Sequence, residues 1–257
     1  MPVILTKFEK QFLEENKDLI ANDQWEELYY RLRNSPVVIK LGDILKGVGI
    51  DLLEDYHICP NGYAAHCESL PTDLNIPEGV KSIGKTAFWE TKVEKVHLPS
   101  TIKAIGSGAF NRCEDLISIN IPAGVEVMEE NAFRRCASLK EVKFAKTSKL
   151  HCIDEGVFQH SGLEKVTLPE GIETIREGAF GECYFLTKIG LPESLTTIMY
   201  GAMSGSQFFK KITYAGTKEQ FKKITLEESW MDYQEEIVTV ACSDGLLKIV
   251  AGEVIDK

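Results

Sequence analysis

The clearest internal order in this chain lies at residues 168–183, which read Leu168-Pro169-Glu170-Gly171-Ile172-Glu173-Thr174-Ile175-Arg176-Glu177-Gly178-Ala179-Phe180-Gly181-Glu182-Cys183. An aliphatic residue and a proline open the segment, and a turn with glycine follows. Two aliphatic residues three positions apart come next. The segment closes with Ala-Phe and a cysteine three positions after the phenylalanine. The same order of residue types recurs along the middle of the chain, with substitutions in some copies.

The copies follow one another at an almost constant spacing. They start at Ile76, Leu98, Ile121, Phe144, Leu168 and Leu191. Tyr214 occupies the equivalent position after the last copy, at the end of a further predicted strand. Consecutive positions in this series are 22, 23, 23, 24, 23 and 23 residues apart. A fixed period in this range predicts a solenoid of stacked coils, because a single unit cannot bury its apolar face without a neighbour.

Each unit contains a segment with the spacing of a short strand, as in Leu163-Glu164-Lys165-Val166-Thr167-Leu168. The fourth and sixth residues are apolar, whereas the third and fifth are mostly polar and point to the opposite side of a strand. Proline then ends the strand in most units, because it has no amide hydrogen for a ladder. The repeat phenylalanines are predicted to stack in one buried column. They are Phe110, Phe133, Phe158 and Phe180.

A second unit, at residues 98–113, reads Leu98-Pro99-Ser100-Thr101-Ile102-Lys103-Ala104-Ile105-Gly106-Ser107-Gly108-Ala109-Phe110-Asn111-Arg112-Cys113. This unit resembles the BspA-like, treponemal-type leucine-rich repeat family, whose signature joins an aliphatic-Pro pair, Ile-Gly and Ala-Phe-x-x-Cys. The resemblance covers roughly 74–214 and implies a right-handed leucine-rich repeat with short parallel strands. Members of this family are mostly surface or secreted binding proteins of bacteria and protists, so the resemblance also implies a binding function.

The sequence divides into three parts, which together predict an α+β repeat solenoid. We expect a helical N-terminal cap of three short helices over 1–70, the second of them at 23–32, the six-unit array over 71–213, and a C-terminal cap over 214–257. Capping structures are expected because the open ends of a solenoid expose apolar edges. A second interpretation of the N-terminal part, as a small recognition module, stays open.

The C-terminal part is predicted to contain a helix and a hairpin. Thr217 begins a capping-box pattern that opens a helix including Ile224. The segments 237–242 and 246–251 flank an Asp-Gly turn and read as a β-hairpin. We expect this hairpin to pair with the last coil and to cover its edge.

The fourth unit departs from the pattern. Ala145 stands where the other units have proline, and two extra residues within 146–149 precede its aliphatic pair, Leu150 and Ile153. Insertions in solenoids form loops on one edge. Two interpretations stay open, namely a loop with a specialised contact and an insertion that the fold simply tolerates.

Charge and hydropathy narrow the class of function. The chain has 257 residues and a formal net charge of −10, divided as −5 over 1–70, −1 over 71–213 and −4 over 214–257. A protein that binds nucleic acid directly is expected to be basic, so this class is disfavoured. No apolar run reaches the roughly 18–20 residues of a membrane span, and no secretory leader pattern opens the chain. We therefore expect no membrane association and a cytoplasmic location.

The seven cysteines do not follow a disulfide pattern. Cys113, Cys136 and Cys183 each lie three residues after a repeat phenylalanine, and Thr or Ser fills this slot in the other units. The substitution pattern indicates a small, half-buried packing position. We therefore expect reduced thiols.

The sequence carries no signature of an enzyme or of a metal site. No phosphate-binding glycine loop, nucleophile elbow or metalloprotease helix is present, so no catalytic residue is predicted. Four metal donors lie close together at His57, Cys59, His66 and Cys67. Their spacing differs from the Cys-x-x-Cys and His-x₃₋₅-His pairs of structural zinc sites, so we expect neither a metal nor a cofactor.

The outward-facing strand positions are the candidate binding surface. Five of these twelve positions are lysine and one is acidic, which predicts a positive stripe perpendicular to the strands. The candidate partner-binding residues are Lys95, His97, Ser118, Asn120, Glu141, Lys143, Lys165, Thr167, Lys188 and Lys211. Such a stripe suits an acidic protein surface. A solvated strand face without a binding role is the simpler interpretation.

These observations predict a non-enzymatic scaffold for protein–protein interaction, because a solenoid presents a long surface rather than a closed pocket. We expect the partner to bind through the solenoid face, through the acidic end domains, or through both. Two more specific functions stay open. The chain is a surface adhesin of a bacterium, as the family resemblance implies. Alternatively, it is carried by a phage or mobile element and inhibits a bacterial defence or nucleic-acid-handling protein. The sequence identifies neither the partner nor the oligomeric state.

Overall fold

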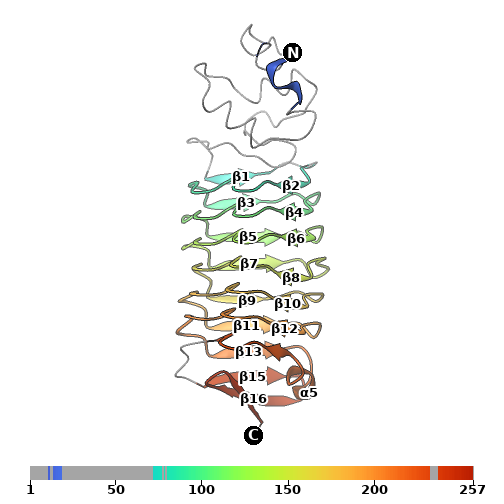
Figure 1. Cartoon of the computed structure of the whole chain (residues 1–257), viewed down its shortest axis with the longest axis vertical. Coiled ribbons are helices and arrows are strands. Elements are labelled where there is room, and N and C mark those ends of the chain that lie inside the picture. Colours follow the sequence, from blue (N-terminus) through green and yellow to red (C-terminus); the bar gives the residue numbers. More distant parts are fainter. Residues whose placement is uncertain are drawn as a thin grey trace.

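The computed structural model describes residues 11, 14–18, 72–76, 78, 80–231 and 237–256. The predictions for 1–70, including the helix at 23–32, lie outside the described residues except at 11 and 14–18. From β1 (Asp73–Asn75) onward the chain winds into stacked coils, and the C-terminal strands lie at the far end of the stack (Figure 1).

Each coil contributes one strand to the side of the solenoid that we call the strand face. Its strands are β1 (Asp73–Asn75), β3 (Lys95–His97), β5 (Ser118–Ile121), β7 (Glu141–Phe144), β9 (Lys165–Thr167), β11 (Lys188–Leu191) and β13 (Lys211–Tyr214). All pairings between these strands are parallel. The central residue of β3, β5, β7 and β9 is buried between more exposed neighbours, as the alternating sequence pattern predicts.

The second residue of each aliphatic pair lies in a second series of two-residue strands, which continues one strand beyond the array. They are β2 (Ser82–Ile83), β4 (Ala104–Ile105), β6 (Val127–Met128), β8 (Cys152–Ile153), β10 (Thr174–Ile175), β12 (Thr197–Ile198) and β14 (Thr225–Leu226). In Figure 1 this series runs beside the first along the length of the stack.

A third backbone ladder, which we call the Phe ladder, follows the Ala-Phe turns. The Phe110 amide donates to the Ala132 carbonyl at 2.8 Å, and the Phe180 amide donates to the Ala202 carbonyl at 2.7 Å. Three ladders per coil satisfy the backbone of the turns as well as that of the strands.

Both strand series are interrupted at the irregular fourth unit. The strand face divides into one sheet ending at β7 and another beginning at β9, and the second series divides between β6 and β8. The Phe ladder continues past this point, because the Phe133 amide donates to Val157 and the Phe158 amide donates to Ala179, both at 2.9 Å. The extra residues at 146–149 lie between β7 and β8. Both interruptions are therefore next to these extra residues, whereas the Ala-Phe turns stay bonded.

The predicted phenylalanine column is confirmed and extends one coil further, to Phe88. All five rings are fully buried. Centroids of successive rings are 5.0, 5.2, 5.7 and 5.5 Å apart, with interplanar angles of 8, 2, 12 and 19°. The largest spacing, between Phe133 and Phe158, falls at the sheet interruption.

The slot three residues after each phenylalanine is buried rather than half-buried as predicted. In four units its side chain donates a hydrogen bond to the phenylalanine carbonyl of the preceding coil, whereas Thr91 donates to Phe88 of its own coil. The Cys113 thiol reaches the Phe88 oxygen at 2.9 Å, and the Ser206 hydroxyl reaches the Phe180 oxygen at 3.1 Å. The five described cysteines are free thiols.

The C-terminal part contains the expected helix start and hairpin. Thr217 and Gln220 form a capping box for the one-turn helix α5 (Lys218–Phe221), which ends before Ile224, contrary to the prediction. β15 (Val238–Cys242) pairs in parallel with β13 and in antiparallel with β16 (Gly245–Val250). A further strand that was not predicted, β17 (Glu253–Asp256), pairs with β16.

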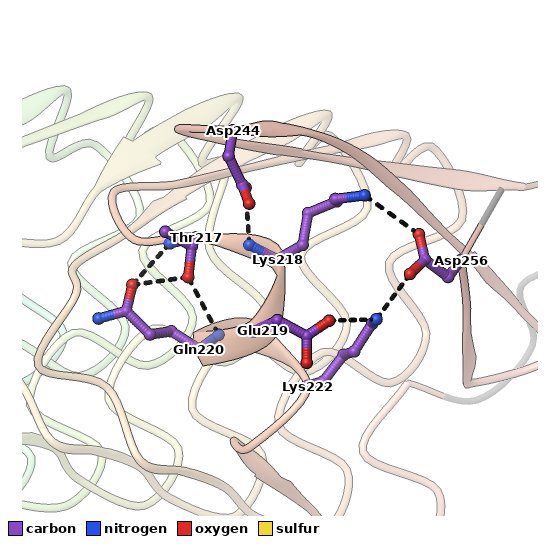
Figure 2. A network of polar contacts seen from close by, with 7 residues as sticks. All are labelled: Thr217, Lys218, Glu219, Gln220, Lys222, Asp244 and Asp256. Atoms are coloured by element: carbon purple, nitrogen blue, oxygen red, sulfur yellow. Dashed lines mark hydrogen bonds and ion pairs between the residues drawn. The ribbon is translucent and has the colours of Figure 1, made fainter.

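Polar contacts join the hairpin to α5 (Figure 2). The Lys218 amide donates to Asp244 Oδ1 at 2.8 Å, and Lys222 Nζ lies 2.6 Å from Asp256 Oδ2. Whether this arrangement acts as a stabilising cap stays a prediction. Within the described part of the chain, no helix is long and apolar enough to cross a membrane.

Candidate protein-interaction face

Three lysines lie side by side on the second half of the strand face. In the parallel register Lys188 of β11 pairs with Lys165 of β9 on one side and with Lys211 of β13 on the other. Adjacent strands lie about 4.8 Å apart, so these side chains leave the sheet at that spacing. We call Lys165, Lys188 and Lys211 the lysine row. Through Thr239 of β15 the same register line reaches Lys248 of β16.

The charges of the lysine row are not compensated within the described residues, since none of its three ammonium groups forms an ion pair there. Like charges opposite each other on neighbouring strands destabilise a sheet. Lys188, between the other two, is also half-buried. The row therefore opposes folding rather than supporting it, and its residue types call for an explanation other than stability.

The first half of the face differs from the predicted positive stripe. Its corresponding register line runs from Asp73 through Lys95 and Ser118 to Glu141, so opposite charges alternate with a neutral residue. Polar contacts between side chains also form here. His97 Nε2 lies 2.8 Å from Asp73 Oδ1, and Lys143 Nζ lies 2.9 Å from Glu141 Oε2.

The remaining candidates lie on the same face, and Asn120 and Thr167 are exposed. The predicted residues therefore share one face, but its unpaired positive charge is concentrated on β9, β11 and β13.

A hollow opens on the strand face where β7 and β9 fail to pair. Its volume is about 470 Å³, within the range of binding pockets in proteins. Lys143, Lys146 and Lys165 line it together with Glu141 and Glu170, above Val142 and Val166. A depression thus lies beside the lysine row, next to the insertion of the fourth unit.

Exposed aromatic side chains border the lysine row, and the sequence analysis did not identify them. Phe185 is 60% exposed, Phe208 is 53% exposed and Tyr184 is 43% exposed. We call these three residues the aromatic edge. Phe185 and Phe208 lie three residues before Lys188 and Lys211, respectively.

Backbone bonds place Phe185 and Phe208 at neighbouring points of consecutive coils. The Glu182 amide donates to the Ser204 carbonyl before them, and the Lys210 amide donates to the Thr187 carbonyl after them. Equivalent positions in earlier units hold Asp115 and Ser138. An alignment of the units would have revealed this signal, because aromatic residues replace polar ones at this position in the later units.

The part of the chain that the structure describes contains no assembled metal site. There, no group of three or more His, Cys, Asp or Glu side chains is arranged to hold a metal ion. His57, Cys59, His66 and Cys67 lie outside the described residues.

The coils, the three ladders and the repeat phenylalanines define a leucine-rich repeat solenoid. A model of the BspA type leucine rich repeat region matches residues 60–170 and 151–231, with six copies. The chain belongs to this family, as the repeat signature predicted. Leucine-rich repeat proteins of this kind are in general non-enzymatic scaffolds that bind protein partners.

Solved structures of bacterial leucine-rich repeat proteins share the fold. One from Bacteroides ovatus is 27% identical, with a TM-score of 0.50, and the match covers 60% of this chain and 44% of that protein. One from Eubacterium ventriosum is 25% identical, with a TM-score of 0.59, covering 68% and 46%. The T. pallidum leucine-rich repeat protein is 26% identical, with a TM-score of 0.50, covering 56% and 74%. No curated protein matches the sequence.

Proposed function

We propose that this chain binds an acidic protein partner through the lysine row and the aromatic edge. The observation that carries the proposal is the unpaired line of Lys165, Lys188 and Lys211, which opposes sheet formation yet has no acidic neighbour in register among the described strands. An acidic partner would supply the missing counter-charges.

The aromatic edge supplies the apolar part of such an interface. Aromatic side chains dominate the energetic centres of protein interfaces, and a charged rim mainly governs association rate and specificity. Phe185 and Phe208 lie next to the lysines, so one partner surface reaches both. The hollow beside Lys165 is suited to receive a protruding side chain of the partner. The mixed first half of the face, with Lys95, His97 and Glu141, then forms the rim.

The first test is a charge reversal of the lysine row, K165E/K188E/K211E. We expect this variant to lose the proteins that the wild-type chain captures from a bacterial lysate, as identified by mass spectrometry. Capture by the wild-type chain should also weaken between about 50 and 300 mM salt, because the Debye length shortens from about 14 to 6 Å. Binding driven by complementary charge weakens over this range of salt concentration.

The matched control is K81E/K85E/K223E, which changes the net charge equally at exposed lysines outside the strand face. It should capture the same proteins as the wild-type chain. Equal capture by the K165E/K188E/K211E variant, with its fold verified by circular dichroism, would contradict the proposal. The variant F185A/F208A should weaken capture while leaving its salt dependence unchanged.

A cytoplasmic location is part of the same proposal. It is supported by the buried thiols of Cys113, Cys136 and Cys183, which act as hydrogen-bond donors only while they are reduced. Fractionation of the source cells with an antibody against the chain tests it. Recovery from the cell surface would contradict this location and would favour the adhesin setting.

A further inference from the structure

A second hollow, of about 380 Å³, lies along the Phe ladder. It is lined by Trp89, Glu90, Asn111, Arg112, Arg134 and Arg135. None of these residues belongs to the lysine row, the aromatic edge or the hollow between β7 and β9. The site is therefore independent of the proposed protein interface.

The lining residues occupy two columns of the repeat in three consecutive coils. The first column directly follows the stacked phenylalanines and holds Trp89, Asn111 and Arg134. The second column holds Glu90, Arg112 and Arg135, all with positive φ, at 57, 60 and 59°. Such angles are uncommon for residues other than glycine. Gly205 occupies the same column in a later unit, so the repeat also accepts glycine here.

The backbone holds the two columns in register. The Arg112 amide donates to the Arg134 carbonyl at 2.8 Å, and the Glu90 amide donates to the Asn111 carbonyl at 2.9 Å. The Arg135 amide donates to the next coil at 2.8 Å. The side chains thus project from a continuous ladder rather than from a free loop.

Positive charge exceeds negative charge in this hollow. Arg112 Nη1 lies 2.7 Å from Glu90 Oε1, which neutralises one arginine. Arg134 and Arg135 form no ion pair with any other described residue. Two guanidinium groups without counter-charges therefore share one depression of a chain whose net charge is −10.

Two polar atoms of the hollow lack hydrogen-bond partners. Arg134 Nε and Asn111 Oδ1 are buried, and neither is satisfied by any described group. Buried polar groups are almost always paired, so each unpaired group requires an explanation. A turn of these side chains toward the hollow would let a bound ligand supply an acceptor to the arginine and a donor to the amide oxygen.

From these contacts we propose that the hollow binds an anionic sugar. Guanidinium groups match phosphate, sulfate and carboxylate in shape, and can bind them through paired hydrogen bonds. Arg134 and Arg135 hold the oxyanion, and a sugar hydroxyl donates to Asn111 Oδ1. The indole of Trp89, 37% exposed, provides the flat apolar surface on which a sugar ring stacks. Phosphate, sulfate and carboxylate all present an oxyanion, and sugars that carry one or another of these groups distinguish between them.

Calorimetric titration of the full chain tests this proposal with glucose 6-phosphate, glucose 6-sulfate, glucuronate, glucose and inorganic phosphate as probes. At least one anionic sugar should bind, at least tenfold more tightly than glucose and than inorganic phosphate. R135Q, at an exposed position, and R134Q should each weaken binding at least tenfold. W89A should weaken binding of the sugar while leaving that of inorganic phosphate unchanged.

The matched control is R176Q, an arginine paired with Asp154 at 3.5 Å and absent from the hollow. It should bind as the wild-type chain does. The proposal is overturned if no anionic sugar binds, or if R135Q binds normally. Equal binding of inorganic phosphate and the best sugar would overturn the sugar assignment. Melting curves of each variant verify that a loss of binding does not reflect unfolding.

Discussion

At the scale of single residues, the slot after each phenylalanine shows why Cys, Ser and Thr exchange there. All three are small and can donate a hydrogen bond, and the structure uses both properties. The thiols of Cys113, Cys136 and Cys183 and the hydroxyl of Ser206 each donate to a phenylalanine carbonyl one coil away. The sequence indicates the small size, but the bond to the neighbouring coil depends on the stacking distance between coils.

Burial also changes the acidity of these thiols. It raises the pKa of Cys113 and Cys183 to about 11 each, and holds the pKa of Cys136 well above its usual value. In the unfolded chain the pKa of a thiol lies near its ordinary value of 9.0. Above that pH the folded state binds more protons than the unfolded state, so the free energy of unfolding falls as pH rises. The stabilisation is complete below about pH 9 and is lost through about pH 11.

We therefore expect the variant C113S/C136S/C183S to resist alkali better than the wild-type chain. Ser is native in this slot at Ser161 and Ser206, so the fold should be retained. Each pKa difference of about 2 corresponds to roughly 3 kcal/mol lost by the wild-type chain at high pH. Urea unfolding under reducing conditions between pH 8 and 11 measures this difference. Parallel pH profiles for the two proteins would contradict the assignment to the thiols.

The phenylalanine column gives a second prediction at this scale. Phe133→Ala, in the middle of the buried column, should lower the free energy of unfolding by about 3–5 kcal/mol, because the stacked coils cannot close the cavity. Phe185→Ala is the control, since Phe185 is exposed and its loss should change stability by no more than about 0.5 kcal/mol. Denaturant unfolding compares the two. Equal effects would contradict the column as the source of stability.

At the scale of strands and ladders, the sequence predicts what repeats and misses what interrupts the repeat. The inward and outward sides of β9 follow from the alternation in Lys165, Val166 and Thr167 alone. The division of the sheets at β7 and β9 does not, because it depends on hydrogen bonds between coils, which the residue types of one unit do not specify. The candidate site shows the same limit. Its lysines were identified from alternation, but their unpaired state depends on the residues beside them in register.

The interruption itself can be tested by removing the insertion. Deletion of Thr147 and Ser148 together with A145P restores the proline and the usual four-residue spacing from the strand end to the aliphatic pair, as between Leu168 and Ile172. We expect β7 and β9 then to pair and the hollow between them to close. The Thr167 amide, which faces β7, should exchange with deuterium at least tenfold more slowly than in the wild-type chain, as measured by NMR. Gly190 lies at the corresponding position of β11, which is already paired on both sides, and its amide serves as the internal control. Unchanged exchange at Thr167 would show that the insertion does not cause the break.

At the scale of the whole molecule, the C-terminal strands continue the solenoid beyond its last repeat. β15 adds to β13 in parallel and continues the strand face, and β16 and β17 extend the same sheet. Val238, Val240, Leu247 and Ile249 of this region are buried against the core. The ion pairs of Asp256 with Lys218 and Lys222 lower the pKa of that carboxyl, but they lie at the surface and add little to stability.

Truncation after residue 236 tests whether the C-terminal strands act as a cap. It removes β15, β16 and β17, and so leaves the edge of β13 unpaired and the core beneath it exposed. An open strand edge pairs readily with another chain, so we expect the truncated protein to self-associate and to melt at a lower temperature. Light scattering after size-exclusion chromatography and thermal unfolding followed by circular dichroism measure both effects. D256N removes only the surface ion pairs and should keep the wild-type mass and melting temperature. A truncated chain that keeps both would show that the array is stable without these strands, and that the pairing of β13 with β15 has a purpose other than capping.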